Sequence, residues 1–366
     1  MSPNTPPFRA DHVGSLLRPA ALHAARTARQ RGEITEEALK EIEDREIRAA
    51  IRKQEQIGLK AVTDGEYRRA MWHFDFLEGL DGVESFVPAQ GIQFSGGIAI
   101  PRAIRVVGKL GYSGHPMIDH FRFVQANTQV MPKMAIPSPS VLHFRGGRRS
   151  IDAKAYPDMA EFYRDLGDAY SKTVRAFADA GCRYLQLDEV NLAYLCDPTL
   201  REHIKARGED PSMLPDIYAG MINAALEGRP ADLVVTTHVC RGNFRSTFIA
   251  SGGYEPVADL LFNRVNVDGY FLEWDSDRAG GFEPLRFVPK NKTVVLGLIT
   301  SKTGTMEQKD IIKRRIEDAT RFVPIEQLCL SPQCGFASTE EGNVLSEDEQ
   351  WAKLGMIVEL ADEVWG

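Results

Sequence analysis

Four side chains of the kinds that bind metal ions stand at or just past the ends of apolar runs in this sequence. They are His238, Cys240, Glu273 and Cys334. Zn²⁺ prefers this mixture of imidazole, thiolate and carboxylate ligands. Because long stretches of chain separate three of the four positions, tertiary structure would have to assemble the site. This favours a catalytic metal over a zinc finger.

The elements that must position these residues are the strands of a parallel sheet. Eight short segments are apolar almost throughout, as buried parallel strands are. They span residues 13–15, 60–63, 133–137, 184–189, 233–238, 269–273, 293–299 and 328–332. Eight strands close a (β/α)8 TIM barrel, in which residues at the C-terminal strand ends converge on one pocket. We therefore predict an α/β fold of this type.

Helical segments alternate with most of these strands. Apolar residues recur with helical spacing in residues 35–58, 159–180, 217–226, 257–262, 306–322 and 346–364. A doubly wound open sheet is the alternative, but no Gly-rich dinucleotide fingerprint follows the first strand. We expect one domain over residues 1–366, in which the region 86–120 forms an inserted hairpin or loop at the barrel mouth.

The composition narrows the class of partner. The 366 residues are 43% hydrophobic and 26% charged, which is typical of a globular chain with a large core. The net charge of −7 argues against nucleic acid and anionic membrane surfaces, and no apolar run is long enough to span a bilayer. Five cysteines without a compact framework fit a reducing compartment. We expect a cytoplasmic protein with a small-molecule substrate, and the sequence leaves both a monomer and a homo-oligomer open.

The motifs at the strand ends together resemble one known family. The zinc site of the cobalamin-independent methionine synthases, in their catalytic C-terminal barrel, has a similar pattern. The similarity covers almost the whole chain and is carried by Asp-His-Val-Gly-Ser at 11–15, Thr-Asp-Gly-Glu at 63–66, Leu-Asp-Glu at 187–189, His-Val-Cys at 238–240, Glu273, and Cys-Gly at 334–335. The chain is similar to a short form that lacks the N-terminal half of the full-length enzyme.

The resemblance implies a role for each motif. A zinc ion would be bound by His238, Cys240, Glu273 and Cys334. Homocysteine, the thiol acceptor, would be held by Val13, Gly14, Ser15, Glu66 and Asp188. The expected reaction is transfer of a methyl group to the thiol to give a thioether such as methionine. The methyl donor would be a folate or another compound.

Two departures from the family pattern concern the methyl donor. The acid histidine of the family is not found after the seventh strand, where Lys302 stands nearest to its position. A cationic lysine is a much weaker proton donor than an imidazolium, so Lys302 either replaces this acid or neutralises a bound anion. The folate-contacting positions also match poorly, with Arg145 and Tyr194 near two of them.

The predicted ligand set suits the activation of a thiol. A free alkyl thiol is mostly protonated at neutral pH, whereas a bound zinc ion stabilises the nucleophilic thiolate. Two cysteinates and a glutamate keep such a thiolate electron-rich. Four protein ligands fill a tetrahedral site, so one bond must yield or the coordination must expand. We expect Glu273 to be the adjustable ligand, because a carboxylate matches zinc less well than a thiolate does.

Other interpretations remain open from the sequence. The enzyme could alkylate a different thiol, as do the epoxyalkane coenzyme M transferases, which this chain resembles in size and in the His-x-Cys pattern. The zinc could also be a structural ion in a non-catalytic barrel. At the barrel mouth, Glu66 and Asp188 could pair with Arg68 or Arg69, and the Gly-Ser pair at 14–15 could simply form a tight turn.

Overall fold

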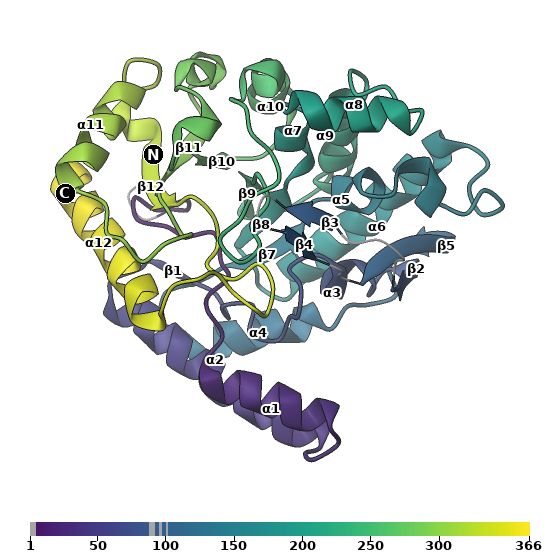
Figure 1. Ribbon diagram of the computed structural model, residues 1–366, viewed down its shortest axis with the longest axis horizontal. Coiled ribbons are helices and arrows are strands. Elements are labelled where there is room, and N and C mark those ends of the chain that lie inside the picture. Colours follow the sequence, from purple (N-terminus) through teal and green to yellow (C-terminus); the bar gives the residue numbers. More distant parts are fainter. Residues whose placement is uncertain (1–4, 88–91, 95–96, 100–101) are drawn as a thin grey trace.

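A computed structural model describes residues 5–87, 92–94, 97–99 and 102–366 (Figure 1). Its centre is a six-stranded, all-parallel sheet with the order β12-β11-β10-β9-β8-β7. The strands are β7 (Met134–Pro137), β8 (Tyr184–Glu189), β9 (Val234–Val239), β10 (Gly269–Glu273), β11 (Thr293–Ile299) and β12 (Leu328–Pro332). Every residue of these strands except Val234 is buried, and the predicted α/β fold with a parallel sheet is confirmed.

Short pairings continue this sheet at both edges. At the β7 edge, β6 (Met131–Pro132) stands one residue before β7 and pairs in parallel with β1 (Ala61–Val62). At the β12 edge, Ala10 forms a parallel bridge with Leu330. The N-terminal segment then reaches the end of β1 through a backbone hydrogen bond from Leu16 to Gly65. This succession of neighbours is the one that an eight-stranded (β/α)8 barrel requires.

The strand predicted at residues 13–15 is wrong in detail. Within the first segment only Ala10 takes part in a bridge, and residues 13–15 have no strand partner. Gly14 adopts a φ of +140°, which interrupts regular extended backbone. The carbonyl of Gly14 instead accepts a hydrogen bond from the Thr63 hydroxyl at 2.6 Å. The segment still lies where a first barrel strand would.

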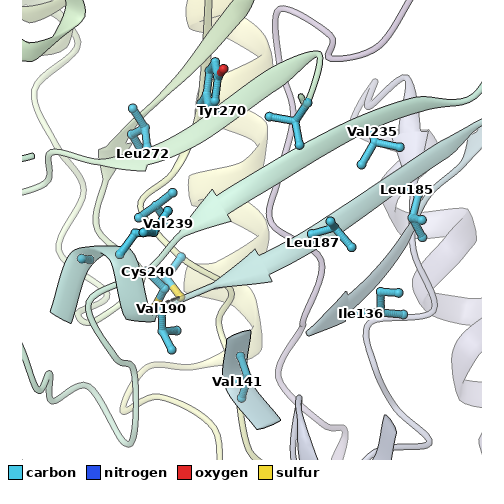
Figure 2. Close-up of a cluster of buried hydrophobic side chains, with 14 of the residues drawn as sticks. Ile136, Val141, Leu185, Leu187, Val190, Val235, Val239, Cys240, Tyr270 and Leu272 are labelled. Carbon is cyan, nitrogen blue, oxygen red and sulfur yellow. Dashed lines mark hydrogen bonds between the residues drawn. The ribbon is translucent and has the colours of Figure 1, made fainter. Parts of the chain in front are cut away.

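Side chains alternate between the two faces of the sheet, as the two-residue period of strands requires. Figure 2 shows Leu185 and Leu187 of β8 beside Val235 and Val239 of β9, in the main core between the sheet and the helices. The residues between them face the other way, toward the barrel interior. Two small apolar clusters fill this interior, one of Phe8, Ala61 and Tyr184 and the other of Val13, Phe271, Val295 and Cys329.

A buried polar network completes the interior. The Lys133 ammonium is 3.1 Å from a carboxylate oxygen of Asp11, and the Tyr184 hydroxyl donates to the other oxygen at 2.8 Å. The ammonium also lies 4.1 Å from the centre of the Phe271 ring. Because the charge is paired and surrounded by hydrogen-bond and aromatic partners, its burial is tolerated.

Helices surround the strands (Figure 1). Apart from α4, which is described below, the longer ones are α1 (Ala20–Gln30), α2 (Glu36–Gln56), α6 (Met159–Asp179), α8 (Pro198–Ala206), α9 (Leu214–Ala225), α10 (Ala258–Arg264), α11 (Lys309–Ala319) and α12 (Glu347–Trp365). Capping residues in the sequence fix several starts. The Thr35 hydroxyl accepts from the Ala38 amide at the start of α2, and Ser346 and Glu349 form a capping box at the start of α12.

The predicted insertion contains antiparallel strands. β2 (Asp81–Phe86) pairs with β5 (Ala103–Gly111), and β3 (Ile92–Phe94) pairs with β4 (Gly97–Ala99). The linking residues 88–91, 95–96 and 100–101 lie outside the described residues. Helix α4 (Met117–Asn127) then leads into β6. Among the described residues, no helix combines the length and the apolar character needed to cross a membrane.

Candidate metal centre and substrate pocket

Three neighbouring strands deliver the predicted metal ligands to one place. His238 lies near the end of β9, with Cys240 just beyond it, Glu273 ends β10, and Cys334 follows β12. His238 is opposite Phe271 in the β9/β10 register and opposite Asp188 in the β8/β9 register. The imidazole therefore points into the barrel, on the face where Phe271 packs.

The four side chains converge closely enough to share one ion. One ligand atom from each of His238, Cys240, Glu273 and Cys334 lies within 4.8 Å of all the others. The two sulfur atoms are 3.5 Å apart. All four residues are buried, with exposures of 0 to 6%. Such a cluster has the donor types and the compactness of a tetrahedral zinc site.

Unpartnered atoms in the cluster test whether its residues fit a cation. Both ring nitrogens of His238 lack a hydrogen-bond partner among the described residues, and so does the Oε1 atom of Glu273. Buried polar groups in this state are rare and require an explanation. A divalent cation bound by these atoms would satisfy the carboxylate oxygen and one imidazole nitrogen together, so the residues fit a metal ion.

Two arginines hold the other oxygen of the glutamate. Oε2 of Glu273 is 3.5 Å from Nη2 of Arg278 and 3.9 Å from Nη1 of Arg241. Arg241 is fully buried and is fixed by hydrogen bonds to the Tyr254 hydroxyl at 2.7 Å and to the Glu273 carbonyl at 3.2 Å. One oxygen of the carboxylate thus faces the cluster while the other faces fixed positive charge.

The two thiols influence each other's ionisation. The hydrogen bond between the sulfur atoms lowers the pKa of Cys334 well below its usual range and raises the pKa of Cys240 well above it. The Gly242 amide also donates to the Cys240 sulfur at 3.2 Å. One thiolate is therefore favoured by the protein alone, and a dication would supply the charge that the second thiolate needs.

The predicted substrate-binding residues surround the same cluster. Val13, Ser15, Glu66 and Asp188 line a cavity of about 670 Å³, including its opening to solvent, together with His238, Cys240 and Cys334. Gly14 lies directly behind the wall, where a Cβ atom would come within 3.7 Å of a Glu66 oxygen. The Ser15 hydroxyl packs against Gly335, the residue after Cys334, and a Cβ there would come within 1.9 Å of it.

The two carboxylates of the pocket hold their protons unusually tightly. Burial raises the pKa of Glu66 to about 7 and that of Asp188 to about 6. Arg69 lies 3.7 Å from Glu66 Oε1, whereas Oε2 of Glu66 has no partner among the described residues. Arg68 points elsewhere and pairs with Glu43 and Asp44. An ammonium group entering the pocket would compensate this buried negative charge.

The backbone at Glu66 is also in an uncommon conformation. Its φ is +61°, directly after Gly65 at +65°. The Asp64 carboxylate accepts from the Glu66 amide at 2.8 Å, and Arg18 donates to the Glu66 carbonyl at 2.9 Å. Strained conformations of this kind persist only where the surroundings fix them, and they concentrate at functional sites.

Lys302 lies behind the pocket wall. Its ammonium donates to the Asn243 side-chain oxygen at 3.2 Å, and Asn243 itself lines the cavity. The hydrogen bond to Cys334 raises the pKa of Cys240 and burial raises the pKa of Glu273, and the Lys302 charge partly opposes both shifts. The same charge adds to the effect of the Cys240 hydrogen bond in lowering the pKa of Cys334. The structure therefore places Lys302 within electrostatic reach of the cluster, but its ammonium faces Asn243.

Several residues of the site were not identified from the sequence. Arg241 directly follows Cys240, and its position next to a predicted ligand could have identified it as a residue of the site. Arg278 lies in the short 3-10 helix η3 (Asp277–Ala279) after β10, and nothing in its sequence neighbourhood indicates a contact with Glu273. The cavity is also lined by His73, for which the sequence leaves both ordinary packing and a cover over the substrate open.

Comparison with known families gives a match over nearly the whole chain. The family model described as "Cobalamin-independent synthase, Catalytic domain" matches residues 8–363. The protein YxjH of Bacillus subtilis, whose name describes it as uncharacterized, is 52% identical over 98% of this chain and 95% of its own length. The methionine synthase of Pyrococcus abyssi is 26% identical over 88% of this chain and 84% of its own length.

A solved structure shares both fold and sequence with the chain. It is a candidate vitamin-B12 independent methionine synthase from Listeria monocytogenes, which is 41% identical. The TM-score is 0.79, and the match covers 99% of each chain. The similarity therefore extends through the strands, the surrounding helices and the loops that carry the cluster.

Proposed function

We propose that this chain, which belongs to the cobalamin-independent methionine synthase family, is a zinc-dependent methyltransferase that methylates a small thiol, most simply homocysteine. The observation that carries the proposal is the convergence of four ligand atoms within 4.8 Å, in the same cavity as the carboxylates of Glu66 and Asp188. The whole chain would act as one catalytic barrel domain.

Zinc is the metal proposed for His238, Cys240, Glu273 and Cys334. Bound there, it would supply the positive charge that keeps a substrate thiol deprotonated and nucleophilic. Arg241 and Arg278 would hold Glu273 through its Oε2 atom, and this ion pairing would stabilise the carboxylate when it is not bound to zinc. This arrangement supports the expectation that Glu273 is the adjustable ligand. Among the described residues, neither Cys240 nor Cys334 has a hydrogen bond to an arginine or a lysine.

The remaining pocket residues would bind the amino-acid part of the acceptor. Glu66 and Asp188 would bind its ammonium group. The positive charge would stabilise the two carboxylates, which burial has removed from water. The segment Val13, Gly14 and Ser15 would hold its carboxylate end. The sulfur would thereby be directed toward the cysteine side of the pocket, where Ser15 and Gly335 are in contact.

Lys302 is proposed to act through charge. Its contact with Asn243 suggests that it orients this amide and offsets the negative charge of the cluster, with no direct proton transfer to the substrate. Either a folate or another methylated compound could serve as donor, and the acid in the family's mechanism would then be supplied by a different group.

The test of this function is a product assay with the zinc-loaded full chain. Homocysteine is incubated with 5-methyltetrahydrofolate or a methylated sulfonium as donor, and methionine is measured by mass spectrometry. Coenzyme M is tested in parallel, and Cys334→Ser is the inactive control. We expect methionine with at least one donor. Alkylation of coenzyme M alone would favour the alternative transferase, and neither product together with no thiol binding would favour a structural zinc.

A further inference from the structure

A buried glutamine lies inside the barrel, beneath the acceptor end of the pocket. Gln186 is the third residue of β8, and its side chain lies on the same face of the sheet as that of Asp188, two residues further along. It is opposite Ala135 in β7 and Thr236 in β9. Its exposure is 0%, and it does not line the cavity. Gln186 therefore acts on the pocket, if at all, through the residues it contacts.

The amide nitrogen of Gln186 joins two parts of the proposed acceptor site. Nε2 donates to the Val13 carbonyl at 2.7 Å and to Oδ1 of Asp188 at 2.7 Å. Val13 belongs to the segment proposed to hold the carboxylate of the acceptor, and Asp188 is one of the residues proposed to bind its ammonium group. Both partners accept, so they use both N–H bonds of the amide and fix its orientation. One nitrogen atom thus connects the binding groups for two parts of the same ligand.

Packing alone does not explain an amide at this position. Oε1 of Gln186 has no hydrogen-bond partner among the described residues. The barrel interior also contains the apolar cluster of Val13, Phe271, Val295 and Cys329. A buried amide oxygen without a partner costs free energy that an apolar side chain of similar volume, such as methionine, avoids. The two hydrogen bonds of Nε2 are therefore what glutamine adds here.

The bond to Val13 also orients the backbone that follows. In a trans peptide unit the N–H points away from the C=O, so the Gly14 amide is turned away from Gln186. The Gly14 carbonyl is fixed in turn by the Thr63 hydroxyl, which donates to it at 2.6 Å, and this orients the Ser15 amide. Neither amide donates a hydrogen bond to another described residue. Both donors are therefore available to a carboxylate.

The bond to Asp188 leaves one carboxylate oxygen for the ligand. Oδ1 accepts from Gln186, whereas Oδ2 forms no hydrogen bond or ion pair with another described residue. Asp188 lines the cavity. An ammonium group that reaches Oδ2 would therefore find this oxygen at a fixed distance from the Gly14 amide, because one glutamine side chain holds both segments.

We propose that Gln186 is a positioning residue that sets the spacing between the carboxylate-binding and ammonium-binding parts of the acceptor site, and thereby its preference for one enantiomer of homocysteine. This inference rests on the proposed function. The metal would bind the sulfur and provide a third point. Only one enantiomer can place its sulfur, ammonium and carboxylate at three fixed points, so loss of the fixed spacing should reduce the discrimination.

The test compares L-homocysteine with D-homocysteine, which have the same charge, pKa values and solvation in water and differ only in geometry. Each is titrated calorimetrically into the zinc-loaded full chain. Gln186→Met removes both hydrogen bonds with little change in volume. Gln327→Met is the matched control, because Gln327 is also buried and its Nε2 donates to the carbonyls of Pro289 and Lys292 at 2.8 and 2.6 Å. Gln327 precedes β12, at the end of the barrel away from the metal ligands.

We expect the wild-type chain to bind L-homocysteine about tenfold more tightly than D-homocysteine, as the loss of one charge-assisted hydrogen bond by the wrong enantiomer predicts. Gln186→Met should bring the two affinities close together, chiefly by weakening L-homocysteine, at unchanged zinc content. Gln327→Met should keep the wild-type ratio. Gln186→Glu is the second variant. Its buried carboxyl group is protonated and has a single O–H, so it can serve only one of the two acceptors and should give an intermediate ratio.

Three results would overturn the inference. The first is equal binding of the two enantiomers by the wild-type chain. The second is an unchanged ratio in Gln186→Met, even where both affinities fall. The third is loss of zinc or of secondary structure in both Gln186 variants, which would assign the glutamine to the fold alone. Failure of both enantiomers to bind the wild-type chain would instead contradict the proposed function, so the two failures are distinguishable.

Discussion

At the scale of single residues, the two clustered cysteines differ from the other buried cysteines of the described chain. Cys240 and Cys334 have sulfur atoms 3.5 Å apart beside an imidazole and a carboxylate, whereas Cys196 is buried outside this cluster. A serine in place of either clustered cysteine removes a soft ligand while nearly preserving its volume. The metal should therefore depend on two particular sulfur atoms.

We predict that Cys240→Ser and Cys334→Ser each lose bound zinc and turnover while keeping most of the barrel. Zinc content by elemental analysis and helix content by circular dichroism measure the two effects. Cys196→Ser is the control for a buried cysteine substitution and should keep both zinc and activity. Full zinc occupancy in either cluster variant would remove that cysteine from the ligand set.

Glu66 provides a pH test at the same scale. Its pKa of about 7 means that the carboxylate is mostly protonated at pH 6 and mostly ionised at pH 8. Only the ionised form attracts the ammonium group of homocysteine. 4-Mercaptobutyrate is the matched ligand, since it has the same thiol and carboxylate without the amine. The difference between the two ligands therefore isolates the amine contact.

Between pH 6 and pH 8, homocysteine affinity should rise about tenfold relative to 4-mercaptobutyrate affinity, because the ionised fraction of Glu66 rises by that factor. Titration calorimetry of both ligands measures the ratio. Glu66→Gln should flatten it. A ratio that stays constant with pH in the wild-type chain would assign the amine to another group.

At the scale of elements, the segment after β12 must lie very close to the N-terminal segment. Gly335 touches the Ser15 hydroxyl, and an added Cβ atom would overlap it at 1.9 Å. Gly355 lies within α12, and a Cβ atom there would meet nothing within 4 Å. The two glycines thus form a matched pair in which the same substitution has opposite consequences.

We predict that Gly335→Ala destabilises the chain by about 1–3 kcal/mol and weakens zinc binding, because it displaces the loop that carries Cys334. Gly355→Ala should stabilise the chain by about 0.5–1 kcal/mol, since alanine favours helix. Urea unfolding and zinc titration measure both variants. Normal stability and zinc affinity in Gly335→Ala would show that the Ser15 contact is not constrained.

The sequence predicted most of the elements that carry the cluster, for identifiable reasons. β10, β11 and β12 are largely apolar runs, and β8 and β9 each begin with two apolar or aromatic residues, so their positions could be predicted to within one or two residues. The prediction of a regular strand in the N-terminal segment was wrong because Gly14 takes a positive φ. Glycine allows this conformation but does not require it, so the sequence does not reveal it. The helix at Ala20–Gln30 was missed because few of its residues are buried.

Residue contacts across the site were less predictable. The four clustered side chains could be chosen because their types and strand-end positions agree. The contact of Arg278 with Glu273 depends on the conformation of the short segment after β10, which leaves no periodic pattern in the sequence. Such contacts required the tertiary structure.

At the scale of the whole molecule, the barrel interior does not depend on the metal for its packing. The cluster of Phe8, Ala61 and Tyr184 and the Lys133–Asp11 pair contain none of the four ligands and do not line their cavity. Phe271 adjoins His238, but it packs on Val13, Val295 and Cys329 without a metal. The parallel sheet and its helices bury a large apolar core around them. Metal should therefore add stability to a chain that already folds.

Removal of zinc with a chelator should lower the melting temperature while far-ultraviolet circular dichroism at 25 °C stays close to that of the loaded chain. Binding to the folded state alone stabilises it by about 4 kcal/mol at a free-metal concentration a thousandfold above Kd. Re-addition of zinc should restore the melting temperature. Loss of secondary structure on chelation would instead indicate that the metal is required for folding.

The most direct test of the central claim is zinc X-ray absorption spectroscopy of the loaded chain with and without homocysteine. The account predicts that the zinc has the two cysteine sulfurs as ligands at rest and gains one more sulfur when homocysteine is added. The oxygen contribution of Glu273 should weaken at the same time. An unchanged sulfur shell at saturating homocysteine would contradict the claim that this metal centre binds and activates the acceptor thiol.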